Sequence, residues 1–177
     1  MMSEESDQVL LIPFLSDHLT RGIWEDERGA IRVRFSERAP SKLVEVFRGV
    51  MRDAVALGFS FREPVLFQTI PEVEMFTPNS SYLFYGRYFS GPNLILVNQR
   101  WTKLMTDTEL RVLLAHELGH GIDVQTQRLG HPVFSEIYNL STQEFADHIA
   151  RLITGDEAVN AFQDTYVLPK RSKRLSK

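Results

Sequence analysis

Two histidines four positions apart, with a glutamate directly after the first, carry the clearest chemistry in this chain. They form the pentapeptide His116-Glu117-Leu118-Gly119-His120. On an α-helix, positions four apart lie about 40° from one another around the axis, so both imidazoles can reach one metal ion. A Zn²⁺ ion held by two imidazoles and one further protein ligand keeps a position for water and lowers the pKa of that water to about 7. Glu117 can take the proton as general base and pass it to a leaving amine, so the motif predicts a zinc-dependent metallopeptidase.

The inventory of metal-binding side chains is small. The chain has five histidines and no cysteine. Disulfides and cysteine-based zinc sites are therefore excluded, which leaves histidines and carboxylates as the strong metal ligands. The alternative is an ordinary amphipathic helix that happens to carry two histidines. With so few histidines in the chain, this spacing beside a glutamate favours the metal site.

The helix that carries the motif is expected to begin near Thr106. Residues 106–109 have the Thr-x-x-Glu pattern of a capping box, and an apolar run follows at once. Gly119 and Gly121 each weaken a helix by about 1 kcal/mol relative to alanine. That cost is easier to understand if small residues are needed beside the metal. We expect Gly121 to lie near the end of the helix.

A third metal ligand must come from elsewhere in the chain. The third histidine that marks metzincins is absent, since Thr126 stands at its position. A helix expected over residues 141–153 offers Glu144 and Asp147, which lie about 60° apart around its axis. We expect Glu144 to bind the zinc and Asp147 to orient a ligand through a hydrogen bond, or to replace Glu144 as the ligand.

Other roles for these polar residues stay open. Ser141 and Glu144 form a second Ser-x-x-Glu capping box, in which Glu144 would only bind the backbone of Ser141. His148 is the expected catalytic donor to the oxyanion that forms during attack on a peptide carbonyl. His131 and Tyr138 compete for that role, and each fits an ordinary loop residue as well.

Residues 104–120 resemble the active-site helix of gluzincin peptidases, and most resemble the family of CAAX prenyl endopeptidases, the heat-shock membrane protease and their small soluble relatives. Residues 143–147, which read Gln-Glu-Phe-Ala-Asp, resemble the downstream motif of that family. In that motif a zinc-binding glutamate is followed by two residues and then by Ala-Asp. The likeness covers residues 75–153. It implies a zincin-like fold, a Zn²⁺ cofactor and a peptide or protein substrate.

The chain departs from the family pattern at the third ligand. The family's glutamate stands three positions before the alanine, where this chain has Gln143, and Glu144 stands two before Ala146. Three interpretations follow. A shift of the helix start would bring Glu144 to the metal, or Asp147 could serve as the ligand instead. In the third interpretation, the metal site is degraded. Proteases that cleave phage repressors have a comparable glutamate followed by Ala-Asn, which Ala146-Asp147 fits less well. The membrane helices of the family are missing, so the chain would be a minimal soluble member.

The remaining sequence predicts a single α+β domain with a zincin-like fold. In it, a small twisted, mostly antiparallel sheet packs on the active-site helix and on the second, ligand-bearing helix. The strand at residues 94–97 is either an exposed edge that could hold an extended peptide or a central core strand. The expected elements are strands at 31–35, 64–70, 82–89 and 94–97, a helix from Ser41 to Gly58, a loop at 123–140, a helix at 141–153 and a last helix at 156–166.

Length, composition and the charge of the N-terminus indicate the class of protein and its location. The chain has 177 residues, of which 43% are apolar and 24% charged, as in ordinary soluble globular proteins. No apolar stretch approaches the roughly 18 residues that span a bilayer. The acidic start of residues 1–17 is the opposite of the basic start of a secretory signal, so we expect a cytoplasmic protein. Secretion by a route that needs no signal would leave no trace in the sequence.

The predicted domain spans residues 21–167, between an N-terminal extension (1–20) and a basic tail (168–177). Five of the last eight residues, from Lys170 to Lys177, are basic. Such a tail can bind nucleic acid or anionic lipid, but a solvated chain end is the more common case, and we do not expect a nucleic-acid partner. The alternative function is a catalytically inactive zincin-like domain that binds or regulates a partner.

Overall fold

The computed structural model describes most of the predicted domain. The described residues are 23–28, 31–36, 40–60, 62–63, 65–70, 85–91 and 93–167. The predicted N-terminal extension (1–20) and basic tail (168–177) lie outside them. The fold class is α+β, as the sequence predicted.

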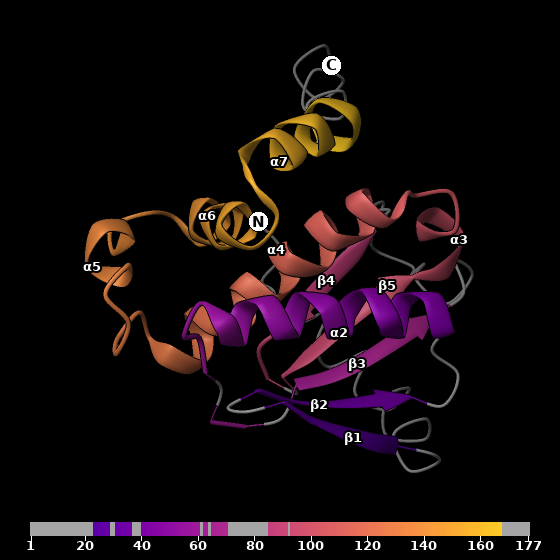
Figure 1. Cartoon of the computed structure of the whole chain (residues 1–177), viewed down its shortest axis with the longest axis horizontal. Coiled ribbons are helices and arrows are strands. Elements are labelled where there is room, and N and C mark those ends of the chain that lie inside the picture. Colours follow the sequence, from indigo (N-terminus) through magenta and orange to yellow (C-terminus); the bar gives the residue numbers. More distant parts are fainter. Residues whose placement is uncertain are drawn as a thin grey trace.

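Five strands form one mixed sheet in the order β1-β2-β3-β5-β4 (Figure 1). The pairs β1–β2 and β4–β5 are antiparallel, whereas β2–β3 and β3–β5 are parallel. The prediction of a mostly antiparallel sheet is therefore wrong. Helix α2 carries the chain from β2 to β3, and a crossover of this kind makes the two strands parallel. The strands are β1 (Ile23–Arg28), β2 (Ile31–Ser36), β3 (Val65–Ile70), β4 (Gly86–Phe89) and β5 (Leu94–Asn98).

Helix α2 (Ser41–Ala56) packs its apolar face against the sheet. The ring of Phe47 stacks on that of Phe67 in β3, with 4.9 Å between the ring centroids, and both side chains are buried. The predicted N-cap is wrong by one residue: Pro40 occupies the N-cap position without a side-chain hydrogen bond, and Ser41 is the first helical residue.

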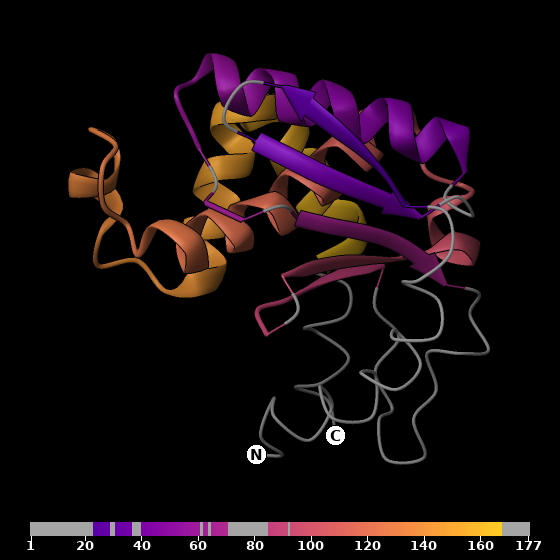
Figure 2. The same cartoon turned by 90° about the horizontal axis from the view of Figure 1, so that it is seen from below.

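Helix α4 carries the His-Glu motif and is longer than predicted. It runs without interruption past Gly121, which is buried in mid-helix, so the start of the predicted loop at 123–140 is helical. Figure 2 shows α2 and the C-terminal helices on one side of the sheet. Within the described part of the chain, no helix is long and apolar enough to cross a membrane. The remaining helices are α3 (Gln99–Thr102), α4 (Asp107–Thr126), α5 (Phe134–Ile137), α6 (Thr142–Thr154), α7 (Asp156–Phe162) and the π-helix η2 (Gln163–Val167).

Among the strands that the structure describes, β4 lies at the edge of the sheet and β5 lies inside it. Every residue of β5 is buried, and β5 pairs with β3 on one side and β4 on the other. Of the two interpretations of residues 94–97, the central core strand is confirmed. The edge strand β4 packs against α4: a Cβ atom on Gly86 would lie 3.6 Å from both Leu113 Cδ1 and Glu117 Cγ. The edge of the sheet therefore lies beside the motif.

Candidate metal centre

The capping box at the start of α4 forms as predicted. The Glu109 amide donates to Thr106 Oγ1 at 3.2 Å, and the Thr106 amide donates to Glu109 Oε2 at 2.7 Å. These bonds satisfy two backbone donors that a helix start leaves without partners. They fix the first residue of α4 and, with it, the direction in which the motif faces more than two turns later.

The two histidines of the motif face one another. Their Nε2 atoms lie 3.1 Å apart, and the rings stand nearly perpendicular, with 4.7 Å between centroids. At this distance, the N–H of one neutral imidazole can donate a hydrogen bond to the lone pair of the other. The same spacing suits one cation, because a Zn²⁺ ion binds imidazole nitrogens at about 2.0–2.1 Å and two such bonds at a tetrahedral angle hold the nitrogens about 3.3 Å apart. His116 and His120 therefore fit a shared metal ion.

Asp147, on α6, fixes the orientation of His116. Its Oδ1 accepts a hydrogen bond from His116 Nδ1 at 2.8 Å, and its Oδ2 accepts one from the Gln163 side chain at 2.9 Å. A carboxylate on Nδ1 places the proton on that nitrogen and leaves the Nε2 lone pair free to bind metal. The structure thus places Asp147 where it orients a candidate ligand, as we expected for one of its two possible roles.

The close approach of α4 and α6 brings Asp147 to that position. A Cβ atom on Gly119 would lie 2.9 Å from Ala146 Cα, a distance that real Cβ atoms essentially never show. The glycine in the motif is thus needed where the two helices touch. This contact, rather than space beside a metal, accounts for the residue at position 119.

The electrostatic environment gives the two imidazoles different pKa values. Burial lowers the pKa of His116, but the hydrogen bond to Asp147 and the charges of Glu117 and Asp147 outweigh that effect, so its pKa is raised. Burial and the neighbouring His116 lower the pKa of His120 from 6.5 to about 4. Without metal, the pair takes up its first proton at His116, and His120 stays neutral at pH 7.

Glu117 is a buried carboxylate beside the edge strand. Its side chain faces β4 and the residue is only 6% exposed. Burial raises its pKa, while the charge of His116, the backbone N–H of Tyr88 and the charge of Arg87 oppose the rise. Raised carboxylate pKa values are typical of groups that take up and release protons near neutral pH.

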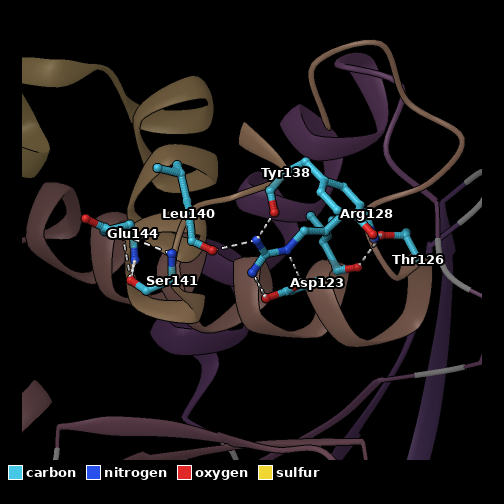
Figure 3. A network of polar contacts seen from close by, with 8 residues as sticks. Asp123, Thr126, Arg128, Tyr138, Leu140, Ser141 and Glu144 are labelled. Carbon is cyan, nitrogen blue, oxygen red and sulfur yellow. Dashed lines mark hydrogen bonds and ion pairs between the residues drawn. The ribbon is translucent and has the colours of Figure 1, made fainter. Parts of the chain in front are cut away.

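The structure places Glu144 in the capping box of α6. Its Oε2 accepts hydrogen bonds from the Ser141 amide at 2.9 Å and from Ser141 Oγ at 2.8 Å (Figure 3). The Glu144 amide donates back to Ser141 Oγ at 3.3 Å. The bonds from Ser141 lower the pKa of Glu144, which is exposed. This arrangement matches the alternative role of Glu144, and its predicted zinc ligation stays a prediction.

Sequence analysis missed a role for Gln143. The side chain of Gln143 contributes, with Asp147, to the raised pKa of His116. The signal was present: Gln143 stands four residues before Asp147, a spacing that places both on one face of α6. Gln143 is also the residue at which this chain departs from the gluzincin pattern.

The three candidates for an oxyanion donor lie in different environments, and Tyr138 is an exposed residue. His148 is half-buried and lines an open cavity of about 530 Å³ together with Asp147 and Gln163. His131 Nε2 donates to the Leu57 carbonyl at 2.8 Å, and its Nδ1 accepts from a backbone amide. These bonds give His131 a structural role in its loop. His148 is the candidate that lies beside Asp147.

An arginine links the end of α4 to the start of α6. Arg128 Nε and Nη2 bind the two carboxylate oxygens of Asp123 at 2.7 and 2.9 Å, and both side chains are 13% exposed. Its Nη1 donates to the carbonyls of Tyr138 and Leu140, each at 2.6 Å (Figure 3). The guanidinium carbon also lies 4.6 Å from the centroid of the Phe145 ring. The loop between the two helices of the site is thus attached to both of them.

Among the residues that the structure describes, no third histidine, cysteine, aspartate or glutamate joins the pair in a metal-binding group. Comparison with family models, with curated proteins and with solved structures found no match.

Proposed function

We propose that this chain is a zinc-dependent metallopeptidase with a zincin-like fold. The observation that carries the proposal is the arrangement of three motif residues. The Nε2 atoms of His116 and His120 face one another at 3.1 Å, and the buried carboxylate of Glu117 lies beside them on the same helix.

Each motif residue has a distinct task in the proposed reaction. His116 and His120 would hold the metal. When bound, zinc would supply an acidified water and polarise the scissile carbonyl. Glu117 accepts a proton and passes it to the leaving amine, and its raised pKa suits both steps. Asp147 keeps the proton of His116 on Nδ1. The predicted oxyanion donor His148 remains a candidate in this scheme.

The edge strand supports a peptide substrate. Strand β4 lies at the end of the described sheet, and Gly86 and Tyr88 in this strand lie beside Glu117. An extended peptide can add to such an edge by main-chain hydrogen bonds, and its carbonyl would then lie near the general base. We therefore propose peptides or proteins as substrates, and the cytoplasm as the place of action.

Replacement of Glu117 tests the proposal. Glu117→Gln keeps the size of the side chain but removes the base, so zinc content measured by elemental analysis should stay unchanged. Cleavage of a mixed peptide library, followed by mass spectrometry, should fall about 10²- to 10⁴-fold. Glu136→Gln, at an exposed position of α5, is the matched control and should cleave as the wild type does. If Glu117→Gln cleaves peptides at the wild-type rate, Glu117 is not the general base.

A zincin-like binding or regulatory module is the second candidate. The observation that favours it is that, among the described residues, no three histidine, cysteine, aspartate or glutamate side chains form a group that could hold a metal ion. Elemental analysis separates the two functions. One zinc ion per chain supports the peptidase, whereas a metal-free and cooperatively folded protein supports the module.

A further inference from the structure

We infer that the side-chain amide of Gln143, not the carboxylate of Glu144, is the third protein ligand of the metal centre. The inference rests on the proposed function, because it completes the ligand set of the same site. It gives a neutral set of two imidazoles and one amide oxygen.

The position of Gln143 on α6 is fixed by Asp147. Residues four apart on a helix lie on one face, about 40° from one another around the axis. Asp147 contacts His116, so this face of α6 points toward the histidine pair. Gln143 lies one turn earlier on the same face, and its side chain lines the same cavity as that of Asp147. Its proximity to His116 also contributes to the raised pKa of that imidazole. A side chain at this place is near any ion that His116 holds.

The carboxylates of α6 are engaged elsewhere. Glu144 lies about 100° from Gln143 around the helix axis. Its Oε2 binds the amide and the hydroxyl of Ser141, so a move to the metal would break both of these bonds in the capping box. Asp147 uses Oδ1 for His116 and Oδ2 for Gln163. Within the described residues, no other histidine, cysteine or carboxylate reaches the pair.

An amide ligand changes the strength of the site. Zinc prefers nitrogen, sulfur and carboxylate ligands, and an amide oxygen brings no negative charge. We therefore expect this centre to bind zinc more weakly than one completed by glutamate. The direct consequence is that a carboxylate placed at position 143 should strengthen metal binding.

Three single variants test the ligand. Gln143→Ala removes the amide, Gln143→Glu supplies a carboxylate at the same place, and Glu144→Gln is the matched control one position away. Zinc affinity is measured on the full chain by competition with a chromogenic chelator, and the visible spectrum with Co²⁺ reports the ligand set. Circular dichroism and thermal unfolding show that each variant is folded.

The expected changes in zinc affinity differ in direction among the three variants. Affinity should fall about tenfold or more in Gln143→Ala and rise about tenfold or more in Gln143→Glu, with an altered Co²⁺ spectrum, because even residues that only orient ligands change affinity 10- to 100-fold. Glu144→Gln should keep the wild-type affinity. Loss of zinc by Glu144→Gln with retention by Gln143→Ala would overturn the inference, as would wild-type affinity in all three variants.

The outcome also separates this inference from the proposed function. If the wild type binds no zinc but Gln143→Glu gains it, position 143 faces the histidine pair, but the Gln143 amide is no ligand and the metallopeptidase proposal fails as well. If neither binds zinc, both proposals fail. If the wild type binds zinc through Gln143 but cleaves no peptide, the ligand assignment stands and the function is wrong.

Discussion

Gly119 and Ala146 lie in backbone contact where α4 crosses α6: a Cβ atom on Gly119 would lie 2.9 Å from Ala146 Cα and 3.0 Å from its carbonyl oxygen. These two residues are direct neighbours of the site, since Gly119 precedes His120 and Ala146 precedes Asp147. The distance between the helices at this point therefore sets whether Asp147 reaches His116.

Replacing Gly119 by alanine should separate the two helices. Overpacking costs about 1–3 kcal/mol, and the better helix propensity of alanine returns at most about 1 kcal/mol. We expect a net loss of about 1–2 kcal/mol in the free energy of unfolding, measured with denaturant, and weaker zinc binding because the bond from His116 to Asp147 lengthens.

Gly49→Ala in α2 is the control for this change. The nearest atom to a Cβ at Gly49 is Nη1 of Arg111 at 3.0 Å, the tip of a flexible side chain that can move. This variant should keep its zinc affinity and its stability to within about 1 kcal/mol. Equal effects of the two substitutions would show that the crossing of α4 and α6 is not the sensitive contact.

Asp147→Asn should weaken metal binding without unfolding the protein. The amide NH₂ of asparagine can donate to His116 Nδ1, which favours the tautomer with its proton on Nε2, and that nitrogen then has no lone pair for the metal. We expect zinc affinity to fall about 10- to 100-fold. Gln163→Leu, which removes the bond to Asp147 Oδ2, should act in the same direction but less strongly. Asp164→Asn, exposed in η2, is the control, and unchanged affinity in Asp147→Asn would contradict the orienting role.

Local signals in the sequence were sufficient to predict several elements. The capping boxes at Thr106 and Ser141 involve residues three apart, so both helix starts are confirmed. The hairpin of β4 and β5 is confirmed as well. The parallel pairing of β2 and β3 was missed, although a strand, a helix and a strand in succession favour it. The strand at 23–28, rich in charged residues, has no alternating pattern that would predict it.

The site was predictable only in part, because long-range contacts select which side chains meet. The facing of His116 and His120 follows from their spacing on a single helix. The choice among the polar residues of α6 depends on the contact between Gly119 and Ala146, which no local pattern shows. Sequence reasoning therefore favoured Glu144, the nearest carboxylate to the family position, whereas the crossing of the helices brings Asp147 to His116.

The stability of the metal-free protein should fall in mild acid because of His120. Its pKa is about 4 in the folded chain and 6.5 in model peptides, so between these values the unfolded chain binds the extra proton. The stabilising contribution of neutral His120 is complete above pH 6.5 and is lost as the pH falls through 4, with a total of about 3 kcal/mol. The raised pKa of His116 acts in the opposite sense, because its contribution is complete below pH 6.5 and is lost as the pH rises through the folded value.

Unfolding by urea in the presence of a chelator, from pH 7 to pH 4, measures this effect. His120→Gln has no titrating group at this position, so its stability should depend less steeply on pH over that interval than the stability of the wild type. Parallel curves for the two proteins would show that His120 keeps its ordinary pKa in the folded chain.

Replacement of Arg128 should lower the free energy of unfolding by a large amount. Arg128→Met leaves the carboxylate of Asp123, which is 13% exposed, and the carbonyls of Tyr138 and Leu140 without their donor. Breaking one side of a mostly buried ion pair and its hydrogen bonds costs about 3–5 kcal/mol, and some rehydration at this position should reduce the loss to about 2–4 kcal/mol. The measurement is the free energy of unfolding in denaturant.

An exposed ion pair provides the comparison for Arg128. Lys42 lies 3.0 Å from Asp107, with side chains 56% and 72% exposed, so Lys42→Met should cost less than about 1 kcal/mol. Because Arg128 links the end of α4 to the start of α6, its removal should also weaken zinc binding, whereas Lys42→Met should not. A loss of stability in Arg128→Met with unchanged zinc affinity would mean that the link through Arg128 is not needed to hold the two helices of the site in position.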